Sequence, residues 1–101
     1  MLAHIVFFSL KDNSANVCQA MVESCKKYLT GHQGEVYFAC GVRNPELSRE
    51  LNDQEFDVAL HIIFDSVANH DLYQEAPRHL EFVKENQQLW SGVRVFDSNC
   101  E

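Results

Sequence analysis

Tyr73 and His79 are the two side chains of this sequence best suited to acid–base chemistry. They lie in the stretch YQEAPRHLEF, residues 73–82, with Pro77 between them. On an unbroken helix, six residues turn the chain through about 600°, so the two side chains would point to opposite sides. A proline inside a helix kinks or breaks it, which could turn them toward each other. The sequence therefore allows a tyrosine–histidine pair at this point.

Such a pair could catalyse proton transfer without a cofactor. Histidine titrates near neutral pH, and a tyrosine hydroxyl can donate a hydrogen bond to a carbonyl or to a developing enolate oxygen. The alternative is that Tyr73 and His79 are amphipathic residues at a helix boundary, each satisfied by a backbone carbonyl. His4, beside apolar neighbours, poses the same choice between a third catalytic group and a satisfied core histidine.

This chemistry also needs an apolar pocket, and the chain offers side chains for its wall. The candidates come from the predicted strands and from the second helical region: Val6, Phe8, Val58, Leu60, Phe82, Trp90, Val93 and Val95. His79, Val83 and Trp90 recur at i, i+4 and i+11. On a continuous helix these offsets place them within roughly 40° of one another around the axis. The spacing predicts one buried stripe over residues 78–90.

The other polar residues of the predicted strands indicate a buried network rather than a second active site. His61 points to the opposite face from the wall residues of its own strand, because side chains alternate along a strand. We expect it to lie in a dimer interior with Asp57 and with Arg94 from the last strand. His32 and His70 have no recognisable partner, and we expect them in a loop and on a helix surface.

The sequence predicts no metal ion and no organic cofactor. Its four cysteines show no CxxC or CxxH spacing, and a set of His4, His79 and carboxylates matches no known ligand spacing. The net charge of −7 argues against a nucleic-acid partner, which requires clustered basic residues. No apolar run approaches the ~20 residues of a membrane span. The first residues lack the features of a signal peptide, so we expect a cytoplasmic location.

These residues are carried by one predicted domain, residues 1–101. Strands are expected at 2–10, 35–42, 56–64 and 92–97. A first helix is expected at 13–31, and a second helical region runs from Ser66 to about Glu75 and again over 78–90, restarted by Pro77. The order βαββαβ is that of the α+β ferredoxin-like fold, in which two helices pack on one face of a four-stranded antiparallel sheet.

Both faces of this sheet are predicted to be apolar. The first strand offers Val6, Phe8 and Leu10 on one side, and Ile5 and Phe7 on the other. A sheet with one wet face would alternate apolar and polar residues more regularly. A second copy of the same sheet is the simplest cover for the face without helices. The sequence therefore predicts a homodimer closed as an α+β barrel.

Four short motifs together resemble the stress-responsive dimeric α/β barrel (Dabb) domain family. They are HIVFFSLK at the start, IIFDSVA at the end of the third strand, then YQEAPRH and a terminal VFD. The resemblance spans nearly the whole chain. It implies a ferredoxin-like dimer, and most members have no assigned reaction. One plant member, olivetolic acid cyclase, closes a linear polyketide by an aldol step with a tyrosine and a histidine of this motif in its pocket.

When the family motif is carried over by position, it selects the same candidate site residues as the acid–base argument above. His4 matches the initial histidine, Tyr73 the motif tyrosine and His79 the last motif histidine. Ala76 replaces the histidine that the family pattern has before the proline. Val58 lies where the plant cyclase has another pocket histidine. This chain therefore has fewer titratable groups than the cyclase.

Three classes of function follow. The first is a barrel protein that binds a small apolar molecule without chemistry of its own. The second is a cofactor-independent enzyme, similar to the polyketide cyclase or to the monooxygenases that share this architecture. The third is a structural dimerisation domain. An apolar cavity that contains both Tyr73 and His79 would favour the first two classes, and a filled core would favour the third.

Overall fold

The elements follow the predicted βαββαβ order, with the second helix in two pieces. The computed structural model describes all residues, 1–101. The elements are β1 (Leu2–Leu10), α1 (Ala15–Leu29), β2 (Glu35–Val42), β3 (Val58–Phe64), α2 (Val67–Glu75), α3 (Pro77–Asn86), a 3-10 turn η1 (Gln87–Leu89) and β4 (Trp90–Asn99). None of the helices is both long and apolar enough to span a membrane.

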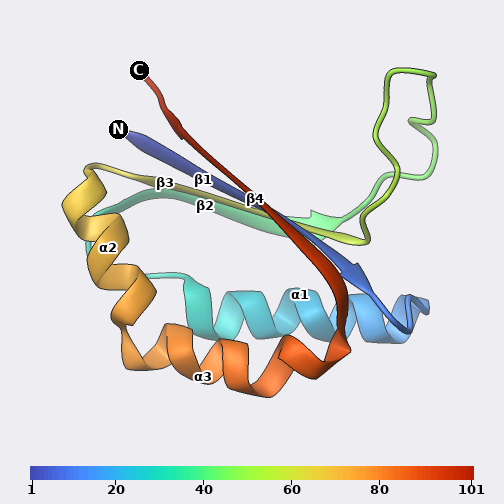
Figure 1. Cartoon of the computed structure of the whole chain (residues 1–101), viewed down its shortest axis with the longest axis horizontal. Helices are drawn as coiled ribbons and strands as arrows, with labels where there is room; N and C mark the ends of the chain where they lie inside the picture. Colours follow the sequence, from blue (N-terminus) through green and yellow to red (C-terminus); the bar gives the residue numbers. More distant parts are fainter.

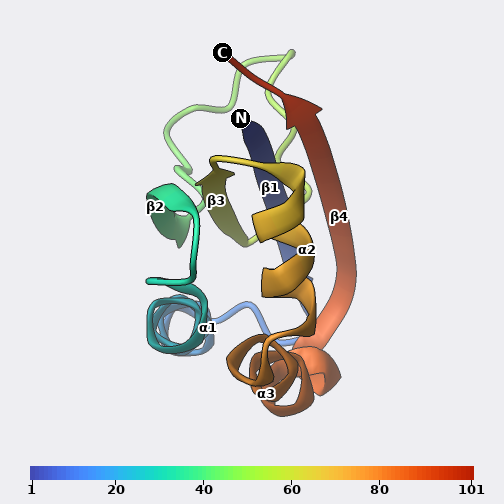
Figure 2. The same cartoon turned by 90° about the vertical axis from the view of Figure 1, so that its left-hand side faces the viewer.

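The four strands form one antiparallel sheet in the order β2-β3-β1-β4. All helices lie on the same side of this sheet, with α1 and α3 side by side (Figures 1 and 2). This arrangement confirms the ferredoxin-like fold. β1 is central and pairs with both β3 and β4, so residues from the two ends of the chain meet. His4 is opposite Ile62 on one side and Asp97 on the other.

The core lies between the sheet and the helices. Alternate residues of β3 point inward and are almost completely buried, namely Val58, Leu60, Ile62 and Phe64. α1 contributes Met21, Val22, Cys25 and Leu29 from its inner side. This regular alternation explains why the strand and helix types could be predicted from apolar spacing.

The break between α2 and α3 lies where the sequence predicted it. Ser66 caps α2, because its hydroxyl accepts a hydrogen bond from the backbone N–H of Asn69 at 3.1 Å. Ala76 ends α2 with an extended backbone, as a residue before proline prefers. Pro77 begins α3 at a position that needs no N–H donor. Figure 1 shows α2 descending from the sheet and α3 turning beneath it.

The predicted stripe over residues 78–90 is wrong at Trp90. α3 ends at Asn86, whose buried side chain donates hydrogen bonds to the Phe82 carbonyl and the Ser24 hydroxyl, both at 2.8 Å. The backbone then tightens into η1, and Trp90 begins β4. Trp90 therefore reaches the core from a strand, where it packs against Phe8 and Phe82 at ring-centroid distances of 5.2 and 6.0 Å.

The third strand begins two residues later than predicted. β3 starts at Val58, which forms the last pair of the β1–β3 ladder, opposite Phe8. Next to this end of β3, the last N–H of β1 is bonded by a side chain and not by a backbone carbonyl: the Asp57 carboxylate accepts the Leu10 N–H at 2.7 Å. β4 is longer than predicted and includes Ser98 and Asn99.

The face of the sheet without helices is apolar and uncovered in the single chain. Phe7 packs against Phe56 and Phe96 at ring-centroid distances of 4.9 and 5.9 Å. Phe96 is nevertheless 52% exposed, and Tyr37 on β2 is 57% exposed. Isolated apolar residues are common on surfaces, but a contiguous patch of this kind usually marks an interaction site.

We expect a second copy of this chain to cover that face, so the protein should sediment as a dimer at micromolar concentration. Phe96→Asp would place a charge in the apolar interface and should give monomers that remain folded. Leu80→Asp is the matched control, because Leu80 is 56% exposed but lies on α3, on the other side of the sheet. Sedimentation of the parent only as a monomer would contradict the expectation.

Candidate functional site

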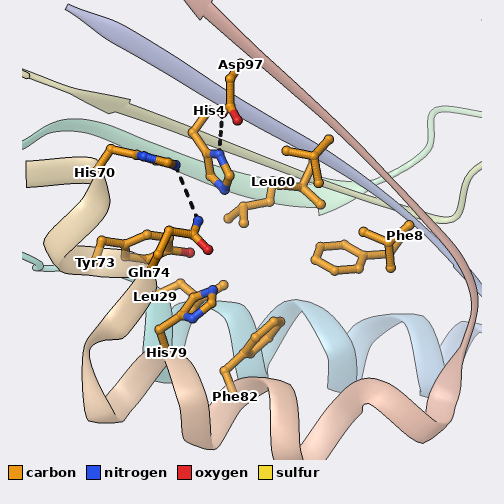
Figure 3. Close-up of a pocket in the computed structure, with 13 residues that line it drawn as sticks. His4, Phe8, Leu29, Leu60, His70, Tyr73, Gln74, His79, Phe82 and Asp97 are labelled. Atoms are coloured by element: carbon orange, nitrogen blue, oxygen red, sulfur yellow. Dashed lines mark hydrogen bonds and ion pairs between the residues drawn. The ribbon is translucent and has the colours of Figure 1, made fainter. Parts of the chain in front are cut away.

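A pocket of about 380 Å³ lies between the sheet and the α2–α3 region (Figure 3). Six of the expected wall residues line it: Val6, Phe8, Leu60, Phe82, Val93 and Val95. Leu29 of α1 adds a further apolar side chain. The polar lining residues are His4, His70, Tyr73, Gln74, His79 and Asp97. The pocket thus has a mainly apolar wall and a set of polar side chains at one side, which is the usual composition of a small-molecule site.

The break at Pro77 brings Tyr73 and His79 into contact. Their ring centroids are 4.7 Å apart, although an unbroken helix would have separated them. Figure 3 shows the Tyr73 hydroxyl directed into the pocket, with no hydrogen bond to another residue drawn there. Nδ1 of His79 is buried and has no hydrogen-bond partner. The His79 ring still interacts with the Gln74 backbone carbonyl, although no hydrogen bond of good geometry forms at Nδ1.

The surroundings of this pair favour the neutral form of both rings. Burial, together with the nearby Cys25 and Glu35, raises the pKa of Tyr73, so its hydroxyl keeps its proton. Burial also lowers the pKa of His79, with smaller lowering effects from neighbouring histidines and an opposing effect from the Gln74 carbonyl. A neutral histidine can accept a proton while a neutral tyrosine donates a hydrogen bond.

His4 belongs to the pocket and is held by a carboxylate. It is only 4% exposed, and its Nδ1 lies 2.6 Å from Oδ1 of Asp97. Burial lowers the pKa of His4 more than the bond to Asp97 raises it. Asp97 was not singled out as a site residue from the sequence, although it ends the VFD motif. Its pairing with His4 in the β1–β4 register was the signal that could have identified it.

His32 lies in the loop between α1 and β2, as expected, and His70 lies on α2 but is largely buried; both rings have partners that the sequence did not reveal. The His70 ring lies 5.0 Å from that of His4 and lines the pocket. The His32 ring lies 5.0 Å from that of Tyr73, and its Nε2 donates to the Tyr28 carbonyl at 2.7 Å. No spacing within the sequence connects these rings, because each contact joins different elements.

Two of the eight expected wall residues lie outside the pocket lining. Val58 is fully buried opposite Phe8 and Val42, farther along the sheet. Trp90 supports the wall from behind through its contacts with Phe8 and Phe82. The indole Nε1 of Trp90 is buried without a hydrogen-bond partner.

The expected network of Asp57, His61 and Arg94 does not form. His61 and Arg94 do lie on the face without helices, around Phe7. The Asp57 carboxylate instead bonds the Leu10 N–H at the end of β1, and Asp53 is the acid that pairs with Arg94 at 2.8 Å. The sequence reasoning assigned Asp57 to β3 by simple alternation, and this assignment failed because the strand begins only at Val58.

The fold and the site together define an α+β protein with a ferredoxin-like sheet and a partly polar pocket between that sheet and its second helical region. The model of the stress responsive A/B barrel domain matches residues 2–100. The chain belongs to this family. No curated protein sequence matches the chain.

Solved structures of similar fold include a protein of Arabidopsis thaliana, At3g17210, with a TM-score of 0.81 at 20% identity over 100% of this chain and 96% of that one. A ferredoxin-like Dabb family protein of Mesorhizobium loti has a TM-score of 0.79 at 20% identity, over 99% and 96% of the two chains. The hydroxynitrile lyase of Passiflora edulis has a TM-score of 0.78 at 21% identity, over 99% and 93%. At these identities the likeness concerns the fold.

The lowered pKa of His79 predicts a loss of stability in acid. The unfolded chain binds a proton on this ring near the ordinary pKa of 6.5, and the folded protein binds it only at lower pH. The contribution of His79 is therefore complete above the unfolded value and is lost as pH falls through the folded value. We expect His79→Gln to lose less unfolding free energy than the parent between about pH 8 and about pH 5, measured by urea denaturation. An equal loss in parent and variant would contradict this assignment.

Proposed function

We propose that this protein binds a small, mostly apolar molecule that carries a carbonyl or hydroxyl oxygen. The cavity of about 380 Å³ supports this proposal, because its size falls within the range of small-molecule sites, roughly 300–1,000 Å³. The apolar wall would bury the body of the ligand. The Tyr73 hydroxyl would donate a hydrogen bond to the oxygen at its polar end.

The edge strand β4 provides the entrance. Val93 and Val95 line the pocket and are still 40% and 50% exposed, so this side is open to solvent. The lining combines apolar side chains with the polar side chains of His4, His70, Tyr73, Gln74, His79 and Asp97. An open apolar cavity with a few converging polar groups is typical of a small-molecule site, which favours a binding site over the third class, a purely structural domain.

Solved ferredoxin-like relatives from Thermobifida fusca and Bacteroides fragilis are described as dimeric. We therefore include self-association through the face without helices in the proposed function. The pocket lies on the other side of the sheet, so ligand binding and dimer formation use separate surfaces.

Trp90 provides a direct test of ligand binding, because it is the only tryptophan and contacts two wall residues. We expect the apolar ketone 2-acetonaphthone to quench its fluorescence saturably. Val95→Phe should fill the entrance and weaken binding about tenfold, since overpacking costs roughly 1–3 kcal/mol. Val67→Phe is the control, because Val67 is similarly exposed, at 54%, but does not line the pocket. Unsaturable quenching, or equal effects of both variants, would count against the proposal.

A second candidate function is cofactor-independent proton transfer on such a ketone. The contact between Tyr73 and His79 at the pocket wall favours it. Neutral His79 would take a proton from the carbon next to the carbonyl; the C–H electron pair would form the C=C bond of the enolate as the carbonyl π pair moved to oxygen. Tyr73 would donate a hydrogen bond to the resulting enolate, and His79 would return a proton to carbon. Among structural relatives, one is a hydroxynitrile lyase and another a putative antibiotic biosynthesis monooxygenase.

Hydrogen–deuterium exchange at the methyl group of 2-acetonaphthone would test this chemistry. We expect the parent to accelerate exchange in D₂O, followed by NMR. His79→Ala and Tyr73→Phe should each reduce the catalysed rate about 100-fold or more, the usual size of a general acid–base contribution. His61→Ala, on the other face of the sheet, should leave the rate unchanged. No acceleration by parent protein that binds the ketone would exclude the candidate for this substrate class.

A further inference from the structure

The polar side of the pocket contains a second constellation, distinct from Tyr73 and His79. His4 from β1, His70 from α2 and Asp97 from β4 each place one possible ligand atom within 4.8 Å of those of the other two. We propose that these three residues bind a divalent transition-metal ion of the Zn²⁺ or Co²⁺ type at the wall of the pocket. The sequence did not suggest this set, because its members come from three separate elements.

Hydrogen-bond partners place the His70 imidazole in the tautomer that metal binding requires. Nδ1 of His70 lies 3.1 Å from the Asp71 carboxylate, which can only accept, so this nitrogen carries the proton. Nε2 of His70 therefore has a free lone pair, which accepts the Gln74 amide at 3.4 Å. A carboxylate behind a ligating histidine is the usual outer partner in metal sites, since it orients the ring and raises its basicity.

His4 and Asp97 form the second part of the site. Their 2.6 Å separation is shorter than that of two donors bound to one ion, which is about 3 Å for metal–ligand bonds of roughly 2.0–2.1 Å. An entering ion would displace the proton now shared by this pair and move the two groups slightly apart. The side chain of Asp97 is 41% exposed, so an ion can reach it from the open β4 edge.

The donor set selects the class of ion. Two imidazoles and one carboxylate suit Zn²⁺, Co²⁺ or Fe²⁺, whereas Ca²⁺ and Mg²⁺ prefer ligand sets made entirely of oxygen. Three protein ligands leave at least one coordination position for water or for an oxygen of a pocket ligand. Gln74 now lies against His70 from the pocket side, so its amide would rotate away as the ion enters.

Metal binding goes beyond the proposed function and can fail independently of it. The apolar wall and the Tyr73–His79 pair need no ion to bind a ketone. The metal experiment in turn uses no organic ligand.

Titration of the metal-free protein with Co²⁺ tests the site, because cobalt bound to nitrogen and oxygen ligands absorbs visible light. We expect one ion per chain, with equimolar Zn²⁺ displacing it. His70→Ala and Asp97→Asn should each weaken binding by about tenfold or more. His70 lies outside the fully buried core, and circular dichroism would establish that both variants remain folded.

His61→Ala is the control for non-specific binding to histidine. His61 lies on the opposite face of the sheet, so its loss should leave both affinity and stoichiometry unchanged. Absence of stoichiometric cobalt binding to the parent would overturn the proposal. Unchanged affinity in folded His70→Ala and Asp97→Asn would also overturn it.

Discussion

The break at Pro77 is the constraint on which the pocket depends. A continuous helix from Ser66 to Asn86 would place Tyr73 and His79 on opposite sides. The residue before a proline avoids helical backbone, so Ala76 is extended and the chain changes direction. α2 then connects the sheet to α3, and both rings face the same space (Figure 3). One local steric rule therefore creates the corner that the cavity occupies.

The central position of β1 brings the remaining polar groups to that corner. β1 is paired on both sides, so a side chain near its start is shielded by two neighbouring strands. His4 is buried there at a cost in desolvation, and the Asp97 carboxylate offsets part of this cost through a short hydrogen bond. His70 approaches from α2, so three elements supply one polar cluster.

The fold was largely predictable because its determinants are local. Apolar alternation identified the strands, helical spacing identified α1, and Ser66 with Pro77 delimited α2 and α3. Predictions failed at the ends of elements, where side-chain hydrogen bonds accompany a departure from the periodic pattern. Asn86 ends α3 before the stripe reaches Trp90, and the Asp57 carboxylate takes the place of a backbone acceptor beside β1. Spacing alone cannot reveal bonds whose partners lie elsewhere in the chain.

The sequence by itself determined the fold class, the apolar character of both sheet faces and the break that pairs Tyr73 with His79. These properties follow from backbone sterics and from residue periodicity, which act over a few residues. Only the tertiary structure decided that His70 faces His4, that Asp97 pairs with His4, and that Asp53 rather than Asp57 pairs with Arg94. These contacts depend on strand register and helix packing, which join residues far apart in the chain.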